Sequence, residues 1–288
     1  MFTAKNYVKV NSIEEAFELN KTRNNVVMGG LMWLKQSHKN INTLIDLSSL
    51  KLNTIEENED FIKIGAMVTL RELEKNALLT KFFGNFFYDA LKGIVGVQFR
   101  NGATIGGSVA GRFGFSDVIT ALSVLDSYVV YFDGEEKTMP LTKYVSLKKD
   151  SSILSHIIIK KHAINTSYAS VRTISTDFPT LAVAVSYTLG SDTQNDRLLS
   201  IAIGARPNVA KVIKFENFDT SELLTSYTQD VNNNSLKHMH DFVNKNIVYK
   251  LDDLTFGDNL KASRYYRIIL AKTLIAKNLF ELAQKGLI

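Results

Sequence analysis

Alternating apolar and polar stretches along the N-terminal half of the chain predict short strands separated by helices. The runs at 26–28, 43–47 and 61–66 are rich in Val, Ile and Leu, which favours strands. Residues Ser12–Glu15 and Thr69–Glu72 each place a hydroxyl residue three positions before a glutamate, the pattern of a capping box that opens a helix. The N-terminal half is therefore predicted to alternate strand and helix.

In the C-terminal half, apolar strands come first and helical patterns follow. Strands at 181–189 and 198–203 predict a hairpin joined by the polar run 190–197. Helical periodicity follows in three segments, 221–227, 235–243 and 262–282. Strands followed by helices are typical of an α+β layer, and we expect the domain boundary near 163–170.

The last predicted helix carries apolar side chains at steps of three and four residues, which predicts a packing face. They are Tyr266, Ile269, Leu270, Leu274, Ile275, Leu279 and Leu282. We expect an α+β fold with a first domain at 1–165, made of two lobes at roughly 1–55 and 56–165, and a second domain at 166–288.

Two glycine pairs in the N-terminal half are the strongest candidates for a binding site. Gly106 and Gly107 have no Cβ, so the backbone there can take positive φ and a ligand can approach the main chain closely. Successive backbone N–H groups in such a turn can form an anion-binding concavity. A helix is predicted to begin after Ser116, a plausible N-cap, and the N-terminus of a helix favours a phosphate group.

The second pair, Gly29 and Gly30, follows the predicted strand at 26–28. A tight turn between a strand and a helix explains a single glycine pair equally well. Two such turns facing one another, however, can hold both phosphates of a dinucleotide. We expect Trp33, shortly after this pair, to belong to the core.

Composition narrows the possible functions. The 288 residues can bury a sizeable core, and the net charge of +5 comes without a long basic run, so we expect no nucleic-acid partner. The absence of cysteine excludes disulfides, thiolate-ligated zinc and iron–sulfur clusters on this chain. No apolar run approaches the ~20 residues of a membrane helix, and no signal-peptide pattern is present, so we expect a cytoplasmic location and no membrane partner.

Motifs of other chemistries are missing. No G-x-G-x-x-G follows a predicted strand, and the sequence contains no Walker A, H-E-x-x-H or G-x-S-x-G pattern. His156 is a lone histidine on a predicted strand, and His238 and His240 have no acidic third ligand at a recognisable spacing. We therefore predict neither a catalytic residue nor a metal site in this chain. NAD as a second substrate stays open.

Several segments resemble one protein family, and they occur in the same order along the chain. They are Val26–Leu34, Thr43–Leu47, Ile62–Ala66, Gln98–Asn101, Thr104–Gly107, Asp117 and Arg264–Arg267. In this order they resemble the FAD-binding subunit of the molybdenum hydroxylases, the xanthine dehydrogenase and carbon monoxide dehydrogenase family. The resemblance implies a two-lobed FAD-binding domain of the PCMH or vanillyl-alcohol-oxidase type, followed by a smaller α+β domain of the CO dehydrogenase flavoprotein C-terminal type.

The resemblance also implies a set of FAD-binding residues. In the N-terminal half they are Val26, Val27, Met28, Gly29, Gly30, Leu31, Met32, Leu34, Arg100, Thr104, Gly106, Gly107, Ser108, Ala110, Gly111, Ser116 and Asp117. Further along, Ile153 and Leu154 match residues that pack against the flavin ring, Phe178 matches an aromatic position beside it, and Arg172 lies among positions that are often basic.

Some of these residues have a structural alternative. Arg100 can support the glycine turn or neutralise phosphate, and Asp117 can bind a ribose hydroxyl or provide a favourable charge at a helix start. Ile153 and Leu154 fit ordinary strand core equally well. Leu31 and Met32 replace a hydroxyl or acidic residue of the family, and Ser108 replaces a frequent Asn, so fewer side-chain bonds to FAD are expected.

The function implied by the resemblance is electron transfer. FAD on this chain would receive electrons from 2Fe-2S clusters on a small partner subunit and pass them to NAD or another acceptor, while a large molybdopterin subunit hydroxylates the substrate. The sequence leaves two alternatives. One is a stand-alone FAD-dependent oxidoreductase, and the other is a non-redox structural subunit that has lost the flavin.

Overall fold

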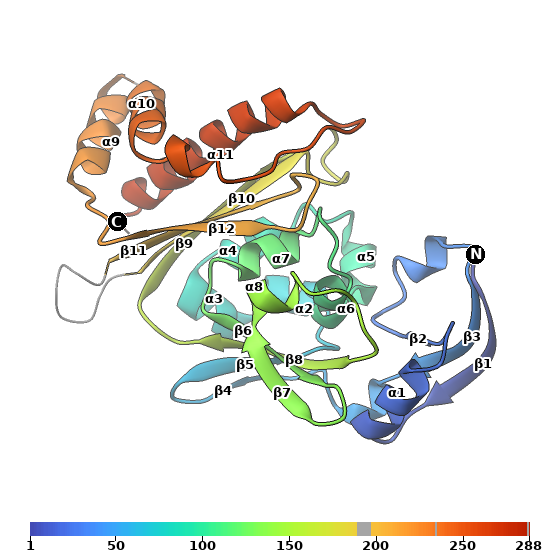
Figure 1. Cartoon of the computed structure of the whole chain (residues 1–288). Helices are drawn as coiled ribbons and strands as arrows, with labels where there is room; N and C mark the ends of the chain where they lie inside the picture. The colour runs from blue at the N-terminus through green and yellow to red at the C-terminus, as the bar shows by residue number, and fades with distance from the viewer. Residues whose placement is uncertain (189–196, 234, 287) are drawn as a thin grey trace. The chain divides into compact units, whose positions relative to one another are not determined.

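The computed structural model describes residues 1–188, 197–233, 235–286 and 288 (Figure 1). The predicted connection at 190–197 therefore lies outside the described residues, except for Arg197. The chain groups into two compact units that interleave along the sequence. The first contains 1–75, 96–112 and 126–161, and the second contains 76–95, 113–125 and 162–288.

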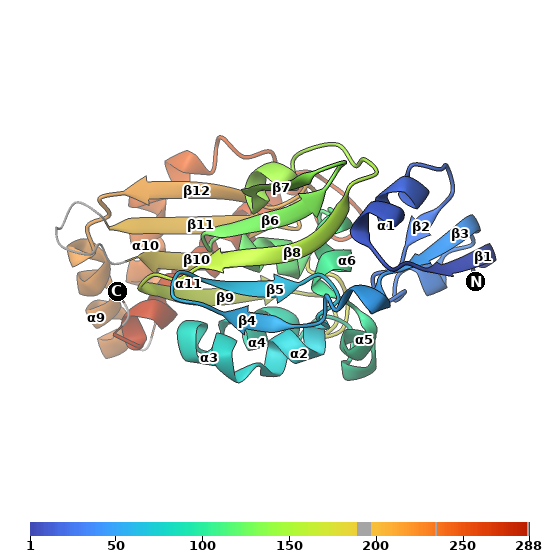
Figure 2. The same ribbon diagram turned by 90° about the horizontal axis from the view of Figure 1, so that it is seen from below.

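The first unit contains a small parallel sheet near the N-terminus (Figure 2). Its strand order is β1 (Thr3–Lys9), β3 (Asn40–Asp46) and β2 (Val26–Val27), and β1 and β2 both run parallel to β3. Helix α1 (Ile13–Asn20) packs on this sheet and begins where the Ser12 hydroxyl accepts the Glu15 N–H at 3.2 Å. Because all three strands point the same way, their carboxyl ends lie at one edge, and the first glycine pair follows β2 there.

The first unit also contains an antiparallel sheet. Its order is β4 (Ile55–Glu57), β5 (Phe61–Gly65), β8 (Ile153–Lys160), β6 (Ser127–Phe132) and β7 (Glu136–Pro140). Helix α6 (Ile105–Ala110) packs on β8, α2 (Leu70–Lys75) packs on α5 (Val97–Gly102), and α8 (Leu141–Tyr144) packs on β6 and β7. The predicted capping box at α2 is confirmed, because Thr69 Oγ1 accepts the Glu72 N–H at 3.1 Å while the Glu72 carboxylate accepts the Thr69 N–H at 2.7 Å.

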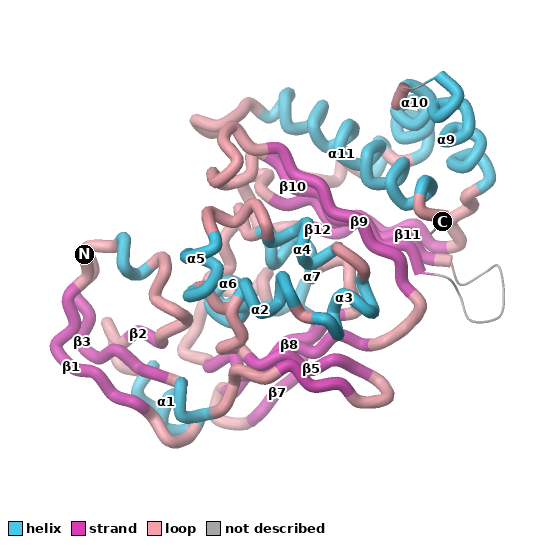
Figure 3. Tube along the Cα trace, turned by 180° about the vertical axis from the view of Figure 1, so that it is seen from behind, coloured by secondary structure: helices cyan, strands magenta, loops and turns pink. Residues whose placement is uncertain are grey.

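The second unit is built on an antiparallel sheet with helices on both faces (Figures 1 and 3). The strand order is β12 (Lys211–Glu216), β11 (Leu198–Gly204), β10 (Leu181–Thr188) and β9 (Ile164–Val171). Helix α11 (Arg264–Gln284) lies on one face, with α9 (Ser221–Asn233) and α10 (Lys237–Asn246) beside it. Helices α4 (Phe86–Leu91) and α7 (Asp117–Leu122) contact the same sheet, and α3 (Ala77–Phe83) packs on α4.

Most of the packing face predicted for α11 is confirmed. Leu270, Leu274, Ile275, Leu279 and Leu282 are buried in the core of the second unit. The prediction is wrong for Tyr266 and Ile269, which are 46% and 42% exposed. The reason is that Arg267 takes the inward position in the first turn, where its guanidinium donates to the carbonyls of Gly257 and Ala262, both at 2.6 Å.

A buried carboxylate organises the connection between α9 and α10. Asp230 is fully buried, and its oxygens accept the backbone N–H groups of His238 at 2.9 Å and Met239 at 2.7 Å. The ring Nδ1 of His238 lies 3.0 Å from the same carboxylate. Asp230 therefore satisfies N–H groups at the start of α10, which have no partner within the helix.

Among the described helices, none is both long enough and apolar enough to cross a membrane.

Candidate dinucleotide-binding site

The two glycine pairs touch one another inside the first unit. A Cβ added to Gly29 would lie 2.9 Å from Gly107 Cα, and a Cβ added to Gly107 would lie 2.8 Å from the Gly29 carbonyl oxygen. Both values are shorter than real Cβ atoms tolerate, so main chain packs directly on main chain here. The two glycine segments therefore face one another in the structure.

The first glycine pair forms a turn in the left-handed backbone region. Gly30 has a φ of +83°, and a Cβ there would lie 1.7 Å from the Gly102 carbonyl oxygen. Leu31 follows with a φ of +64°, an unusual value for a residue with a side chain. Glycine is thus required at position 30 for both conformation and space. The Met32 side chain packs against Gly102, since a Cβ on Gly102 would lie 2.6 Å from the Met32 sulfur.

The second glycine pair is not a turn, which corrects the sequence-based expectation. Gly106 and Gly107 lie in the first turn of α6 and neither has a positive φ. Thr104 caps this helix, accepting the Gly107 N–H through Oγ1 at 3.1 Å, and the Gly106 N–H donates to the Ala66 carbonyl at 2.9 Å. Glycine is needed here for close approach, because a Cβ on Gly106 would lie 2.6 Å from the Ala66 oxygen.

The free hydrogen-bond donors therefore belong to the first segment. Within the part of the chain that the structure describes, the backbone N–H groups of Gly29, Gly30, Leu31 and Met32 donate to no protein acceptor. All four residues are half-buried. Backbone N–H groups are rarely left unpaired away from water, and consecutive ones are suited to bind an anion. We call residues 29–32 the donor turn.

The residues flanking the donor turn serve the scaffold. Val26 and Val27 pair with Leu44 and Ile45 in the small sheet, and the Met28 N–H donates to the Ile45 carbonyl at 2.8 Å. Leu34 opens a short 3₁₀ helix (Leu34–Gln36).

The remaining candidates on α6 make hydrogen bonds within that helix. The Ser108 hydroxyl donates to the Thr104 carbonyl at 2.9 Å, and the N–H of Gly111, the residue after Ala110, donates to the Gly107 carbonyl at 3.0 Å.

Arg100 forms a buried ion pair. Its Nε and Nη2 donate to the two carboxylate oxygens of Glu74 at 2.8 and 3.1 Å, and Arg71 Nη1 lies 2.9 Å from the same carboxylate. Burial opposes ionisation of Glu74, but the hydrogen bonds from Arg100 and Arg71 outweigh it and lower its pKa. This pairing favours the supporting role for Arg100. The sequence does not indicate that Glu74 is the partner of Arg100, because Glu74 follows the pattern of an ordinary glutamate in a helix.

Two candidate residues of the second unit are joined directly. Asp117 is 4% exposed, and its Oδ1 accepts hydrogen bonds from Arg172 Nη2 at 2.7 Å and from the Tyr168 hydroxyl. Burial raises the pKa of Asp117, and the charge and hydrogen bond of Arg172 offset part of this effect. Ser116 caps α7 as predicted, its hydroxyl accepting the Ile119 N–H at 3.2 Å. The ribose contact of Asp117 stays a prediction.

The three apolar residues expected near the flavin ring, Phe178, Ile153 and Leu154, differ in what they pack against. Phe178 is half-buried, and its ring centroid lies 4.1 Å from that of Phe115, which itself stacks on Phe113 at 5.2 Å. Ile153 is 1% exposed and packs in the core of the first unit with residues of α1 and β3, and Leu154 is 5% exposed. Burial agrees with the strand-core interpretation of Ile153 and Leu154. Their contact with a flavin ring stays a prediction.

Comparison with known proteins identifies the family. Residues 1–164 match the model of the family described as the FAD binding domain in molybdopterin dehydrogenase. The chain belongs to this family. The resemblance inferred from the ordered motifs is therefore confirmed.

Relatives of this FAD-binding family member include two curated proteins. The protein named Uncharacterized protein YgfM of Escherichia coli K12 is 27% identical over 158 residues, which cover 54% of this chain and 58% of the relative. The protein of the same name from Escherichia coli O157:H7 matches with the same values. The alignment thus spans less than two thirds of these relatives.

Solved structures of a CO dehydrogenase and a quinoline 2-oxidoreductase share the fold along nearly the whole length. A chain of the reconstituted CO dehydrogenase from Oligotropha carboxidovorans superposes with a TM-score of 0.79 at 16% identity, covering 99% of both chains. A chain of quinoline 2-oxidoreductase from Pseudomonas putida 86 gives a TM-score of 0.77 at 17% identity, covering 100% of both. These matches confirm the α+β fold, and the family match identifies its first part, residues 1–164, as the FAD-binding domain that a C-terminal domain follows.

Proposed function

We propose that this protein is the FAD-carrying electron-transfer subunit of a molybdopterin-dependent hydroxylase or dehydrogenase. The observation that supports the proposal is the donor turn, a run of consecutive backbone N–H groups with no protein acceptor among the described residues. Contacts that only glycine permits hold this turn against α6 and the Gly102 peptide. Membership of the FAD-binding family supports FAD as the dinucleotide that this turn would bind.

In this proposal the donor turn binds the diphosphate of FAD. Consecutive N–H dipoles attract a negatively charged group without any charged side chain. Leu31 and Met32 contribute main-chain donors where the family resemblance leads us to expect a hydroxyl or acidic side chain. Their apolar side chains limit access of water, and a lower local dielectric strengthens the remaining hydrogen bonds. Backbone donors thus compensate for the missing side-chain contacts.

The redox partners in this proposal lie on other chains. Bound FAD supplies the ability to take up electrons singly and release them in pairs. Because the chain has no cysteine, the 2Fe-2S clusters would lie on a small partner subunit, and the molybdopterin would lie on a large one. We propose NAD or another acceptor as the final electron acceptor. The chain itself would bind and orient the flavin nucleotide.

The decisive experiment is purification of the native complex followed by reconstitution. We expect the chain to copurify with iron, molybdenum and FAD, and the separated chain, once stripped, to take up FAD much more tightly than FMN or riboflavin. The preference follows from the diphosphate, which FMN and riboflavin lack. A yellow, active chain without partners would indicate a stand-alone oxidoreductase. A folded, colourless chain that takes up no FAD, even with its partners, would refute the proposal.

A further inference from the structure

Large apolar side chains are exposed at the end of the second unit where α11 begins. The connection from β9 to β10 and the segment leading into α11 lie at this same end of the sheet (Figures 1 and 3). Leu260 is fully exposed, Tyr265 and Ile174 are 75% and 65% exposed, and Tyr266 and Ile269 are 46% and 42% exposed. Tyr265 and Ile269 share one face of α11, since four residues separate them. We call these five residues the apolar patch.

One ion pair joins the two loops that carry the patch. Lys261 Nζ pairs with the Asp177 carboxylate, which links the hairpin of Leu260 to the turn of Ile174. The Asp177 N–H donates to the Ile174 carbonyl at 3.0 Å and closes that turn. The exposed side chains therefore belong to one connected surface. Contiguous exposed apolar surface of this kind marks interaction sites in soluble proteins.

The hairpin that presents Leu260 is held in place from below. The backbones of Asn259 and Ala262 exchange two hydrogen bonds, at 3.1 and 3.2 Å. The buried Arg267 donates to the Ala262 carbonyl and to Asn259 Oδ1, both at 2.6 Å. Leu260 is thus fixed in solvent before any partner arrives, and an anchor that is already ordered loses little entropy on binding.

Positive charge borders the apolar patch. Residues 174–178 and 257–272 contain the basic residues Lys261, Arg264, Arg267 and Lys272 and the acidic residues Asp177 and Asp258. Lys261 is neutralised by Asp177, whereas neither Arg264 nor Lys272 forms an ion pair within the described part of the chain. Asp258 accepts the Arg264 backbone N–H at 2.6 Å. The basic residues therefore outnumber the acidic ones around the exposed apolar side chains.

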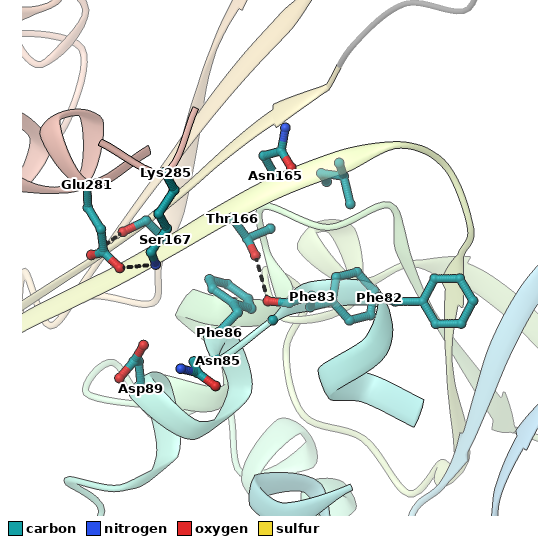
Figure 4. A pocket seen from close by; sticks show the side chains of 12 residues that line it. Phe82, Phe83, Asn85, Phe86, Asp89, Asn165, Thr166, Ser167, Glu281 and Lys285 are labelled. Atoms are coloured by element: carbon teal, nitrogen blue, oxygen red, sulfur yellow. Dashed lines mark hydrogen bonds and ion pairs between the residues drawn. The ribbon is translucent and has the colours of Figure 1, made fainter. Parts of the chain in front are cut away.

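The opposite end of α11 shows a different arrangement. A cavity there is lined by residues of α3, α4, β9 and the end of α11 (Figure 4). Lys285 pairs with Glu281 at 2.5 Å, and Lys92 pairs with Asp89 at 2.6 Å. The charges at that cavity are satisfied within the chain. Unpaired charge beside exposed apolar side chains is found instead at the start of α11.

The apolar patch adjoins Phe178, which the family resemblance matches to an aromatic position beside the flavin ring. Lys261 Nζ lies 5.8 Å from the centroid of the Phe178 ring, and the Asp177 carboxylate accepts the Phe178 N–H at 2.7 Å. A protein serves redox chemistry by positioning its cofactors, and a donor of electrons must bring its own redox centre close to the flavin. A patch next to Phe178 favours the electron donor as its occupant.

We propose that the apolar patch is the docking surface for the small 2Fe-2S subunit. The inference rests on the proposed function, which supplies this partner. A cluster held by cysteines is negatively charged, because four thiolates and two sulfides outweigh two ferric ions, and Arg264 and Lys272 complement that charge. Tyrosine and arginine are enriched among the residues that dominate binding at interfaces, and Tyr265 and Tyr266 stand next to Arg264.

The affinity of the isolated 2Fe-2S subunit for the purified, FAD-loaded full-length chain tests the proposal. Ile269→Asp places a carboxylate in the apolar patch and should weaken binding roughly 30-fold or more, the effect of losing a central interface residue. Val231→Asp is the matched control, because Val231 is a 47% exposed aliphatic residue on α9 of the same unit. It should bind like the wild type. Both variants should keep FAD and the wild-type unfolding temperature.

The charge of the patch has a separate readout in the association rate. Association of the wild-type chain should slow as salt is added, and Arg264→Glu should slow it severalfold and remove part of the salt dependence. Lys277→Glu makes the same charge change on the same helix, about 20 Å further along its axis and well beyond the screening length in 0.15 M salt. This control should keep the wild-type rate.

The outcomes separate this inference from the proposed function. If the wild-type complex contains iron and Ile269→Asp binds the 2Fe-2S subunit within about twofold of the wild type, the inference alone is wrong. It is also wrong if Ile269→Asp binds the small subunit normally and loses the large molybdopterin subunit instead. A wild-type complex without iron would refute the proposed function, and the inference with it.

Discussion

Gly30→Ala is the sharpest test of the donor turn. The left-handed φ of +83° costs an alanine roughly 1–2 kcal/mol. In addition, the new Cβ would lie 1.7 Å from the Gly102 oxygen, whereas non-bonded heavy atoms prefer roughly 3.5 Å. The two main-chain segments must therefore separate by about 1.5–2 Å, and overpacking of this kind costs about 1–3 kcal/mol. We expect Gly30→Ala to lower the free energy of unfolding by about 2–5 kcal/mol.

The same separation misaligns the N–H groups of the donor turn. A hydrogen bond to a charged group contributes about 1.5–3 kcal/mol, so loss of one such bond weakens FAD roughly 10- to 100-fold. The measurement is a titration of the stripped protein with FAD, followed by flavin fluorescence, beside urea unfolding of the same sample. Both effects have one cause, the contact between Gly30 and the Gly102 peptide.

Gly134→Ala is the matched control. Gly134 also has a positive φ of +113°, but the nearest atom to a Cβ there is Phe17 Cε1 at 3.9 Å, an ordinary contact. This variant should lose stability through its backbone conformation alone and bind FAD like the wild type. If folded Gly30→Ala binds FAD within about twofold of the wild type, the assignment of the donor turn to the diphosphate is wrong.

Three further predictions follow from the buried polar groups. Arg172→Met should destabilise the protein by about 3–5 kcal/mol because it leaves the buried Asp117 carboxylate without its cationic partner, whereas adding Asp117→Asn should restore part of the loss, measured as a double-mutant cycle in urea. Burial raises the pKa of Glu74, but the hydrogen bonds from Arg100 and Arg71 outweigh burial and leave the pKa below its ordinary value. The stabilisation by Glu74 should therefore be complete above the unfolded-state pKa of about 4.3 and decrease as the pH falls through the lowered folded-state pKa. Glu74→Gln should remove that part of the acid dependence, and an unchanged pH profile of unfolding would contradict this. Asp230→Ala should cost about 1–3 kcal/mol by leaving N–H groups of α10 unpaired, with thermal unfolding as the measurement and full stability as the contrary result.

The local patterns of the sequence predict much of the fold correctly. The capping box at Thr69, the N-cap at Ser116 and the buried face of α11 from Leu270 to Leu282 all occur as predicted. Each of these features depends on residues within a few positions of one another, so the sequence contains all the information needed. The ordered series of segments from Val26–Leu34 to Arg264–Arg267 was likewise enough to indicate the family.

The sequence by itself determines where glycines, caps and apolar stripes occur, because these act through neighbours along the chain. The tertiary structure alone decided that Gly106 and Gly107 lie in a helix, where Gly106 packs closely on Ala66 and Gly107 on Gly29. It also decided that Arg100 pairs with Glu74 and Asp117 with Arg172. Such pairings join residues distant in sequence, and whether a side chain faces a ligand or an internal partner depends on which segments pack together.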